Sequence, residues 1–193
     1  MGRGGVRELL GSRFVLFSCE GAAEGVVMQR LYDEDVLAVP SERVVVDPMM
    51  FTPYTRLRKA GDISQRFLGT SYEGYGASGL LIARIVDSRA GKFVLPRRWS
   101  RDVAIESFFT RPEIEMLVIH AEDAYGVWQK ACRRDRQLRP SEFCKGQLGL
   151  DRVKETVFLR DYWDTHNLVG AIKSYDEHRG RKDGELSLGD LIA

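Results

Sequence analysis

An apolar stretch that ends in a glutamate constrains the fold of this chain more than any other feature. Residues 13–18 have the β-branched and aromatic content of a buried strand, and they lead to Glu20 and Gly21. The next residues, 22–34, place apolar side chains at helical spacing. A strand followed directly by a helix opens an α/β unit. This order places Glu20 at the carboxyl end of a strand, where open α/β sheets bind their ligands.

Further apolar stretches predict the rest of a sheet. Residues 80–86 form the strongest predicted strand, which ends at Asp87, and residues 103–109 predict another. Shorter apolar runs at 36–39 and 43–46 predict one or two strands near a sheet edge. We therefore predict an α/β fold with a mainly parallel sheet, flanking helices and a helical C-terminal part.

The segments between these strands are less regular. Residues 51–68 predict a broken helix or an ordered excursion, and residues 69–79 predict a loop because they contain four glycines. Residues 93–95, which precede Pro96, could return as the partner of a hairpin.

The second half of the chain has the spacing of helices. Residues 113–133 predict one long helix, although 118–120 could instead be a strand. A further helix begins near a Ser141 cap, and a last amphipathic helix covers 160–179. The polar tail at 180–190 predicts a mobile segment.

The composition allows one sizeable core. With 193 residues, 44% of them hydrophobic, we expect an α/β core over 1–125 and a helical extension over 126–193 that packs on it. The 29 Lys and Arg residues nearly balance the 28 Asp and Glu residues, so net charge does not indicate a nucleic-acid partner, although it permits a local basic surface.

Cysteine content and hydropathy exclude several classes of protein. Cys19, Cys132 and Cys144 are too few and too far apart for a disulfide framework or for the paired cysteines of a zinc site, so we predict reduced, buried thiols. No apolar run approaches the roughly 18 residues that span a bilayer, and the first residues lack a secretory signal. We expect a cytoplasmic protein with no membrane partner.

Three carboxylates are expected at one edge of the sheet. Glu20 and Glu24 are four residues apart across a turn into a helix, and Asp87 reaches the same edge from another strand. Converging carboxylates raise one another's pKa, and Mg²⁺ relieves that cost because it takes oxygen ligands. Each residue also has a plain structural explanation: a solvated turn for Glu20, the helix dipole for Glu24, and a backbone-bonded turn for Asp87.

The same residues resemble a known family. The pattern Glu20-Gly21-x-x-Glu24 after an apolar strand, followed by a strand that ends in Asp87, resembles the Toprim-type fold of metal-dependent nucleases, topoisomerases and primases. Among these, the RloB-like and OLD-type defence-associated nucleases are the most similar, because their later proline, apolar-glutamate and helix pattern resembles residues 112–120. The resemblance implies that Glu20 and Asp87 hold Mg²⁺ or Mn²⁺ while Glu24 supports them.

The chain departs from the family at one ligand. The second aspartate of the family's DxD motif falls on Arg89, and a guanidinium binds phosphate but cannot ligate a cation. Glu113 or Glu115 could replace the missing ligand, although acids at a helix start also gain from the helix dipole. In another alignment of the DxD motif, Glu122 and Asp123 are the acids.

A basic stretch follows Asp87. Arg89, Lys92, Arg97 and Arg98 are candidates for contact with substrate phosphates, and aromatic residues interleave with them. An equally good explanation is a solvated basic edge.

Two hypotheses for function follow. The first is a Mg²⁺-dependent phosphodiesterase that hydrolyses nucleic acid in phage defence, as the resemblance implies, with catalytic candidates Glu20, Glu24, Asp87, Glu113 and Glu115. The second is a catalytically inactive Toprim-derived module that binds nucleic acid or a protein partner, and it is motivated by Arg89. A homo-oligomer is compatible with either.

Overall fold

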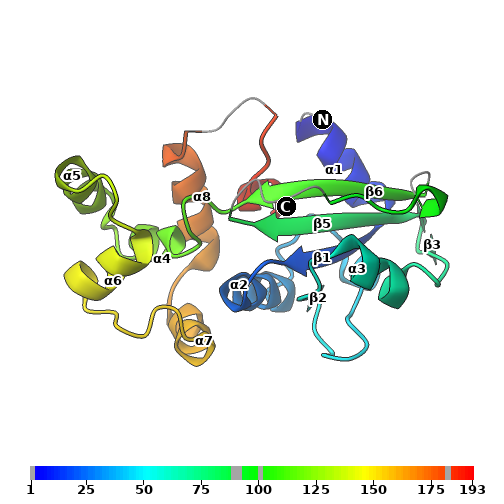
Figure 1. Cartoon of the computed structure of the whole chain (residues 1–193), viewed down its shortest axis with the longest axis horizontal. Helices are drawn as coiled ribbons and strands as arrows, with labels where there is room; N and C mark the ends of the chain where they lie inside the picture. The colour runs from blue at the N-terminus through cyan, green and yellow to red at the C-terminus, as the bar shows by residue number, and fades with distance from the viewer. Residues whose placement is uncertain (1–2, 88–92, 100–101, 181–183) are drawn as a thin grey trace.

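A parallel sheet organises one half of the molecule in the computed structural model, which describes residues 3–87, 93–99, 102–180 and 184–193 (Figure 1). Within these residues the strands pair in the order β2-β1-β5-β6, and every pairing is parallel. The strands are Phe14–Cys19 (β1), Tyr54–Thr55 (β2), Leu80–Val86 (β5) and Val103–Phe109 (β6). The predicted α/β class is confirmed, and the predicted strands at 80–86 and 103–109 have the observed bounds.

The two central strands form the best-buried pair of the sheet. β1 and β5 run in register from Phe14 beside Leu80 to Cys19 beside Ile85. Their side chains are buried on both faces, with Arg84 the half-buried charged exception on β5. Near-continuous apolar sequence is what a parallel strand covered on both faces requires, and this explains why these two strands were the clearest in the sequence.

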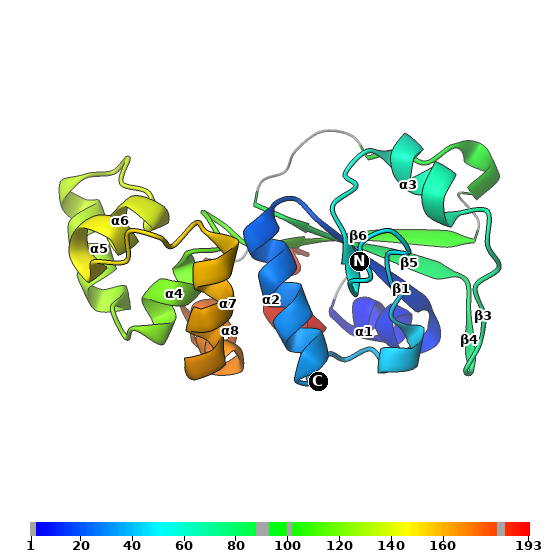
Figure 2. The ribbon, with the colours of Figure 1, turned by 90° about the horizontal axis from the view of Figure 1, so that it is seen from below.

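Helices cover both faces of the sheet. The helices α1 (Arg3–Ser12) and α2 (Ala22–Asp33) lie on one face, and α3 (Ala60–Phe67) lies on the other (Figure 2). Because successive strand residues point to opposite faces, Phe17 packs in the cluster that contains α2, whereas Ile82 packs with α3. The helix predicted at 22–34 is confirmed as α2.

The remaining helices form the second half of the molecule, which the carboxyl ends of the strands face (Figure 1). Here α4 packs on α8 and α6, while α7 packs on α2. The division predicted at residue 125 stays a prediction; α4 precedes it and nevertheless lies among these helices. Their bounds are Met116–Ala121 (α4), Tyr125–Arg134 (α5), Pro140–Leu148 (α6), Thr156–Thr165 (α7) and Leu168–His178 (α8).

Two long predicted helices are each broken in the structure. The helix predicted at 113–133 is wrong, because the chain turns between α4 and α5, where Asp123 has a positive φ of 51°. The helix predicted at 160–179 is wrong as well, because α7 ends before α8 begins. At that break Asn167 caps α8, and its Oδ1 accepts a hydrogen bond from Gly170 N at 2.8 Å. Local capping overrides the continuous apolar spacing.

Three predictions for the α/β half also need correction. The runs at 36–39 and 43–46 form isolated bridges around a 3₁₀ turn, Ser41–Arg43, instead of strands. The loop predicted at 69–79 contains a small antiparallel hairpin, β3 (Glu73–Gly74) with β4 (Ala77–Ser78). Residues 93–95 are not a strand; Leu95 is buried in the core beside α3.

The C-terminal tail is folded onto the sheet. Leu186 forms a parallel bridge with Phe108, and Leu188 and Leu191 are completely buried. A 3₁₀ helix, Leu188–Leu191 (η3), follows, with Asp190 Oδ2 accepting from Ser187 N at 2.8 Å. The mobile tail predicted at 180–190 is therefore wrong where the structure describes it, because its leucines supply part of the core.

The structure also bears on the thiols and on membrane association. Cys19 and Cys144 are buried free thiols, as predicted, whereas Cys132 is only partly buried. Among the described residues, none of the helices combines the length and the apolar character needed to cross a bilayer.

The close approach of α2 to β2 depends on Gly25. A Cβ atom at this position would lie 2.5 Å from the ring of Tyr54, which is itself buried. We predict that Gly25→Ala lowers the free energy of unfolding by about 1–3 kcal/mol, measured by urea denaturation, because overpacking displaces a strand.

Gly146 provides the control for this substitution. It lies in α6, and a Cβ atom there would meet no neighbouring element within 4 Å. Gly146→Ala is therefore expected to stabilise the fold by about 0.5–1 kcal/mol through helix propensity. Equal effects of the two substitutions would contradict the packing explanation.

Candidate acidic site at the carboxyl edge of the sheet

Glu20 and Asp87 meet at the ends of neighbouring strands. Glu20 N donates to Ile85 O at 3.0 Å and so continues the β1–β5 ladder by one residue. Its side chain then crosses to the end of β5, where Oε2 accepts a hydrogen bond from Asp87 N at 3.1 Å. The parallel register thus brings these two predicted acids to one edge of the sheet.

The glycine between the two glutamates has a steric role. Gly21 has an extended backbone, with φ of −128°, which any residue can adopt. A Cβ atom on Gly21 would, however, lie 2.6 Å from Glu24 Oε2. The Glu-Gly-x-x-Glu spacing therefore folds the Glu24 carboxylate back over Gly21, in the first turn of α2, where the helix dipole favours a negative charge.

A third element contributes a buried acid. Glu115 precedes α4, and only 6% of its surface is exposed, compared with 7% for Glu24. Burial raises the pKa of both carboxyl groups. The negative charges of Glu115, Asp87 and Glu20 raise the pKa of Glu24 further, and those of Glu113 and Asp87 add to the increase at Glu115. These groups therefore interact as one acidic cluster, formed by Glu20, Glu24, Asp87 and Glu115.

Glu113 has a different partner from the acidic cluster. Its Oε2 accepts a hydrogen bond from Ser141 N at 3.1 Å, and its Oε1 lies 3.7 Å from Lys154 Nζ. Glu113 thus satisfies a free N–H at the start of α6. The predicted Ser141 cap is wrong: α6 begins at Pro140, and Glu142 Oε2 accepts from Arg139 N at 3.0 Å.

The alternative acids lie at the break between α4 and α5. Glu122 Oε1 accepts a hydrogen bond from Tyr162 OH at 2.8 Å and lies 3.5 Å from His166 Nε2. Asp123 occupies the left-handed turn that ends α4. The charges that raise the pKa of Glu24 come from Glu115, Asp87 and Glu20. Burial raises the pKa of the Cys144 thiol, and Glu122 instead acts there, with Glu115 and Glu113, to raise it further.

The acidic cluster has the right donors for a hard cation but does not form a cage. Carboxylate oxygens are the ligands that Mg²⁺ and Mn²⁺ prefer. In the parts of the chain that the structure describes, no three His, Cys, Asp or Glu side chains are placed to hold a metal ion together. The donor chemistry therefore fits an ion at Glu20 and Asp87, whereas binding would require the carboxylates to turn toward a common point.

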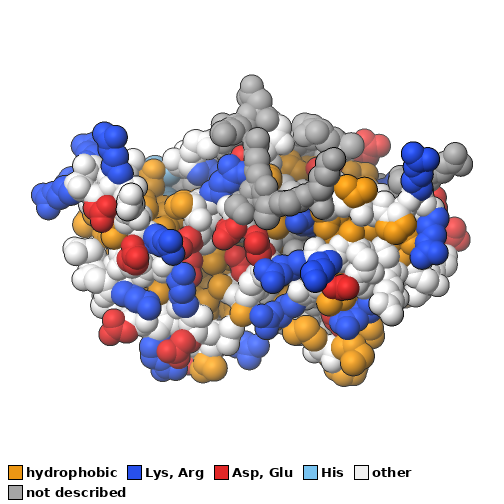
Figure 3. Space-filling model, in the orientation of Figure 1, with side chains coloured by type: hydrophobic (Ala, Val, Ile, Leu, Met, Phe, Trp, Pro, Cys, Tyr) orange, Lys and Arg blue, Asp and Glu red, His pale blue; other side chains and the backbone are white. Residues whose placement is uncertain are grey.

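Basic side chains flank the acidic region. Figure 3 shows acidic side chains gathered near the level where β5 ends, with Lys and Arg side chains on either side. Arg97 and Arg98 do not belong to this edge: they lie in an exposed 3₁₀ turn, Arg97–Trp99, whose Trp99 lies with Leu80 and Val103 at the amino ends of the strands. The Arg98 guanidinium is 5.3 Å from the Trp99 ring. The predicted phosphate contacts Arg89 and Lys92 lie outside the described residues.

A cation on β5 lies beside the acidic cluster, as the basic residues around Asp87 in the sequence predict. Arg84, on β5, is half-buried, and burial lowers its pKa while the charge of Glu20 acts to raise it. Its guanidinium lies 4.6 Å from the ring of Phe93. In the sequence, Arg84 stands out because it is a charged residue in an otherwise apolar strand. The head group of such an arginine must reach either solvent or a charged neighbour.

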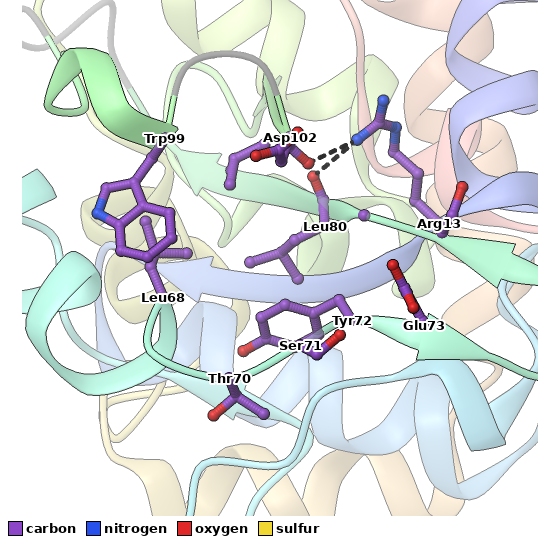
Figure 4. Close-up of a pocket in the computed structure, with 12 residues that line it drawn as sticks. Arg13, Leu68, Thr70, Ser71, Tyr72, Glu73, Leu80, Trp99 and Asp102 are labelled. Atoms are coloured by element: carbon purple, nitrogen blue, oxygen red, sulfur yellow. Dashed lines mark hydrogen bonds between the residues drawn. The ribbon is translucent and has the colours of Figure 1, made fainter.

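A hollow of about 350 Å³ lies at the other edge of the sheet (Figure 4). It is lined by Leu80 and Val103, the first residues of β5 and β6, and by the side chains of Tyr72 and Trp99. Arg13 Nη1 donates to the backbone oxygen of Asp102 at 2.9 Å beside it. Because it lies at the amino ends of the strands, this hollow is separate from the acidic cluster.

Comparisons with known proteins identify no relative: no protein-family model, curated protein or solved structure matches the chain. The resemblance to Toprim-type nucleases therefore remains a prediction from the sequence motif.

The raised pKa of Glu24 predicts a dependence of stability on pH. A carboxyl group whose pKa is higher in the folded state than in the unfolded chain destabilises the fold progressively as pH rises from the unfolded to the folded pKa, and fully above the folded pKa. We expect Glu24→Gln to raise the free energy of unfolding at pH 7 by more than the roughly 0.5 kcal/mol of an ordinary surface change. The gain should shrink as pH falls through the folded pKa toward the unfolded value, because the wild-type carboxyl group then becomes neutral.

Glu8, an exposed residue of α1, provides the matched control. Glu8→Gln should leave stability within about 0.5 kcal/mol at each pH. A destabilised Glu24→Gln at pH 7, measured by denaturant titration, would show that the Glu24 charge stabilises the fold.

Proposed function

We propose that the acidic cluster is the catalytic centre of a Mg²⁺-dependent phosphodiesterase that hydrolyses nucleic acid. The convergence of four carboxylates from β1, α2, β5 and the start of α4 is the observation that carries this proposal. Burial and mutual repulsion make this arrangement costly, and perturbed carboxyl groups gathered at one edge are typical of functional sites.

The residues of the cluster divide into two roles. Glu20 and Asp87, which are more exposed than the other two acids, would hold the ion. When bound, Mg²⁺ would neutralise phosphate charge and lower the pKa of a bound water. Glu24 receives the proton that the attacking water releases, since its raised pKa makes it a stronger base than an ordinary carboxylate. Glu115 increases that basicity through its charge.

Hydrolysis transfers one proton to Glu24 and takes one from solvent. The water oxygen forms a bond to phosphorus, its proton passes to Glu24, and the bond between phosphorus and the leaving oxygen breaks. The leaving oxygen then takes a proton from solvent. Arg84 lies beside Glu20, and its guanidinium suits contact with a phosphate oxygen.

The choice of substrate and setting rests on the family resemblance. The Glu20-Gly21-x-x-Glu24 motif resembles that of RloB-like and OLD-type nucleases, which suggests nucleic acid as substrate and phage defence as setting. The exposed Arg97 and Arg98 lie toward the amino edge of the sheet, so they would attract the phosphate backbone of a polyanion that extends beyond the acidic cluster.

The second candidate is an inactive module that binds nucleic acid or a protein partner. It is favoured by the absence, among the described side chains, of three ligands placed around one point. Arg89, which stands where the family has an acid, supports the same alternative.

The enzyme hypothesis predicts a specific loss at Glu20. Glu20→Gln keeps an oxygen that can accept the hydrogen bond from Asp87 N, so the fold should be retained. We expect Mg²⁺ and Mn²⁺ to raise the Tm of the wild type but not of the variant, and the cleavage rate to fall about 100-fold or more.

Glu73→Gln, on the exposed β3 hairpin, is the control and should keep both responses. Full activity in Glu20→Gln would refute the assignment of the site. No stabilisation by either ion, together with no cleavage by the wild type, would favour the inactive module.

The basic turn predicts a separate effect on binding. Reversing Arg97 and Arg98 to glutamate should weaken nucleic-acid binding by about tenfold or more at low salt and reduce its salt dependence, because fewer counterions are released. Fluorescence anisotropy with a labelled oligonucleotide at several salt concentrations measures both. Unchanged affinity and unchanged salt slope would place the binding surface elsewhere.

A further inference from the structure

A second cavity lies in the helical half, away from the acidic cluster. It has a volume of about 370 Å³ and is bordered by α4, α5 and α8. Its lining contains five rings, from His120, Tyr125, Trp128, Tyr175 and His178. None of the acids of the acidic cluster lines it. The volume falls within the roughly 300–1,000 Å³ of small-molecule sites.

His120, which lines this cavity, has a buried polar atom without a partner among the described residues. The residue is 8% exposed, and its ring stacks on Tyr125 with centroids 4.8 Å apart. Nδ1 lies 2.9 Å from Ser174 Oγ, but Nε2 is buried and has no hydrogen-bond partner among the residues that the structure describes. Burial, assisted by the neighbouring His178, lowers the pKa of His120 to about 4, so the ring is neutral at pH 7. Buried polar atoms in proteins normally have a hydrogen-bond partner.

Two arginines line the same cavity. Arg111 and Arg179 both line it, and both form ion pairs with the buried carboxylate of Glu185. Arg179 Nη1 also donates to Phe109 O at 2.7 Å. Arg111 Nη2, in contrast, is buried without a hydrogen-bond partner in the described part of the chain. The charges of two guanidinium groups, Arg111 and Arg179, and of two carboxylates, Glu185 and Asp176, all act on Tyr175. One nitrogen of Arg111 still has its donors unused.

We propose that this cavity binds a nucleoside 5′-monophosphate. The rings of Tyr125, Trp128 and Tyr175 supply flat apolar surface for a base. Arg111 supplies the donors that match a phosphate, and His120 Nε2 supplies a hydrogen bond to the base or sugar. The inference does not rest on the proposed phosphodiesterase, because it uses other residues on other elements.

The lining of this cavity differs in its chemistry from the lining of the hollow at the amino edge of the sheet. In that hollow Arg13 donates to the backbone oxygens of Asp102 and Leu80, and the indole nitrogen of Trp99 points away from Tyr72 (Figure 4). The cavity in the helical half is lined by Arg111 with its unused donor, by the neutral imidazole of His120, and by the aromatic rings.

Calorimetry with the full chain tests the proposal. AMP, GMP, CMP and UMP are titrated beside the matched nucleosides and inorganic phosphate. We expect at least one nucleotide to bind about tenfold or more tightly than its nucleoside and than phosphate alone, because base and phosphate are recognised together. No binding by any nucleotide at millimolar concentration, or equal binding of phosphate alone, would overturn the proposal.

Substitutions of residues that line the cavity show where the nucleotide binds. Arg111→Gln and His120→Phe should each weaken the nucleotide about tenfold or more. Because Arg111→Gln removes a partner of Glu185, Arg111→Lys is measured as well: it retains the charge and loses the planar fork, and it should also weaken binding. Arg133→Gln, at an exposed position of α5, is the matched control and should bind as the wild type does. Unchanged affinity in folded Arg111→Gln and His120→Phe would place the nucleotide elsewhere and refute the assignment.

Discussion

The parallel pairing of β1 with β5 is the constraint on which the rest of the structure depends. These strands lie side by side over their whole shared length and are buried on both faces, so helices must cover both sides of the sheet. The same pairing places Glu20 and Asp87 at one edge of the sheet, where Asp87 N donates a hydrogen bond to the Glu20 carboxylate. The core and the acidic cluster are consequences of one register.

The acidic cluster is an unfavourable arrangement that the core has to offset. Glu24 and Glu115 are both buried, and burial and neighbouring negative charges raise their pKa. Neutral or apolar residues at these positions would avoid the cost of desolvation. Local electrostatic cost at the ligand-binding edge of an α/β sheet is the physical reason to assign a function there instead of a structural role.

The helical half contributes more than a cover for this edge. The segment that follows β6 carries Arg111 toward the ring-lined cavity, Glu113 toward the start of α6, and Glu115 toward Glu24. One short connection therefore separates two chemically different environments, an acidic one beside the sheet and one among the helices where arginines and aromatic rings line a cavity. The buried Glu185 of the C-terminal segment holds Arg111 and Arg179 in the second environment.

The sequence by itself determined the central strands, the first crossover helix and the shared edge of Glu20, Glu24 and Asp87, because strand burial and helix spacing are local patterns. Local spacing could not reveal that α4 and α5 are separate, that Glu113 serves α6, or that the C-terminal leucines complete the core. The partners of these residues are distant in the chain. Only the tertiary structure decided how Glu115 reaches Glu24 and how Arg111 and His120 come to line one cavity, because such contacts depend on how whole elements pack.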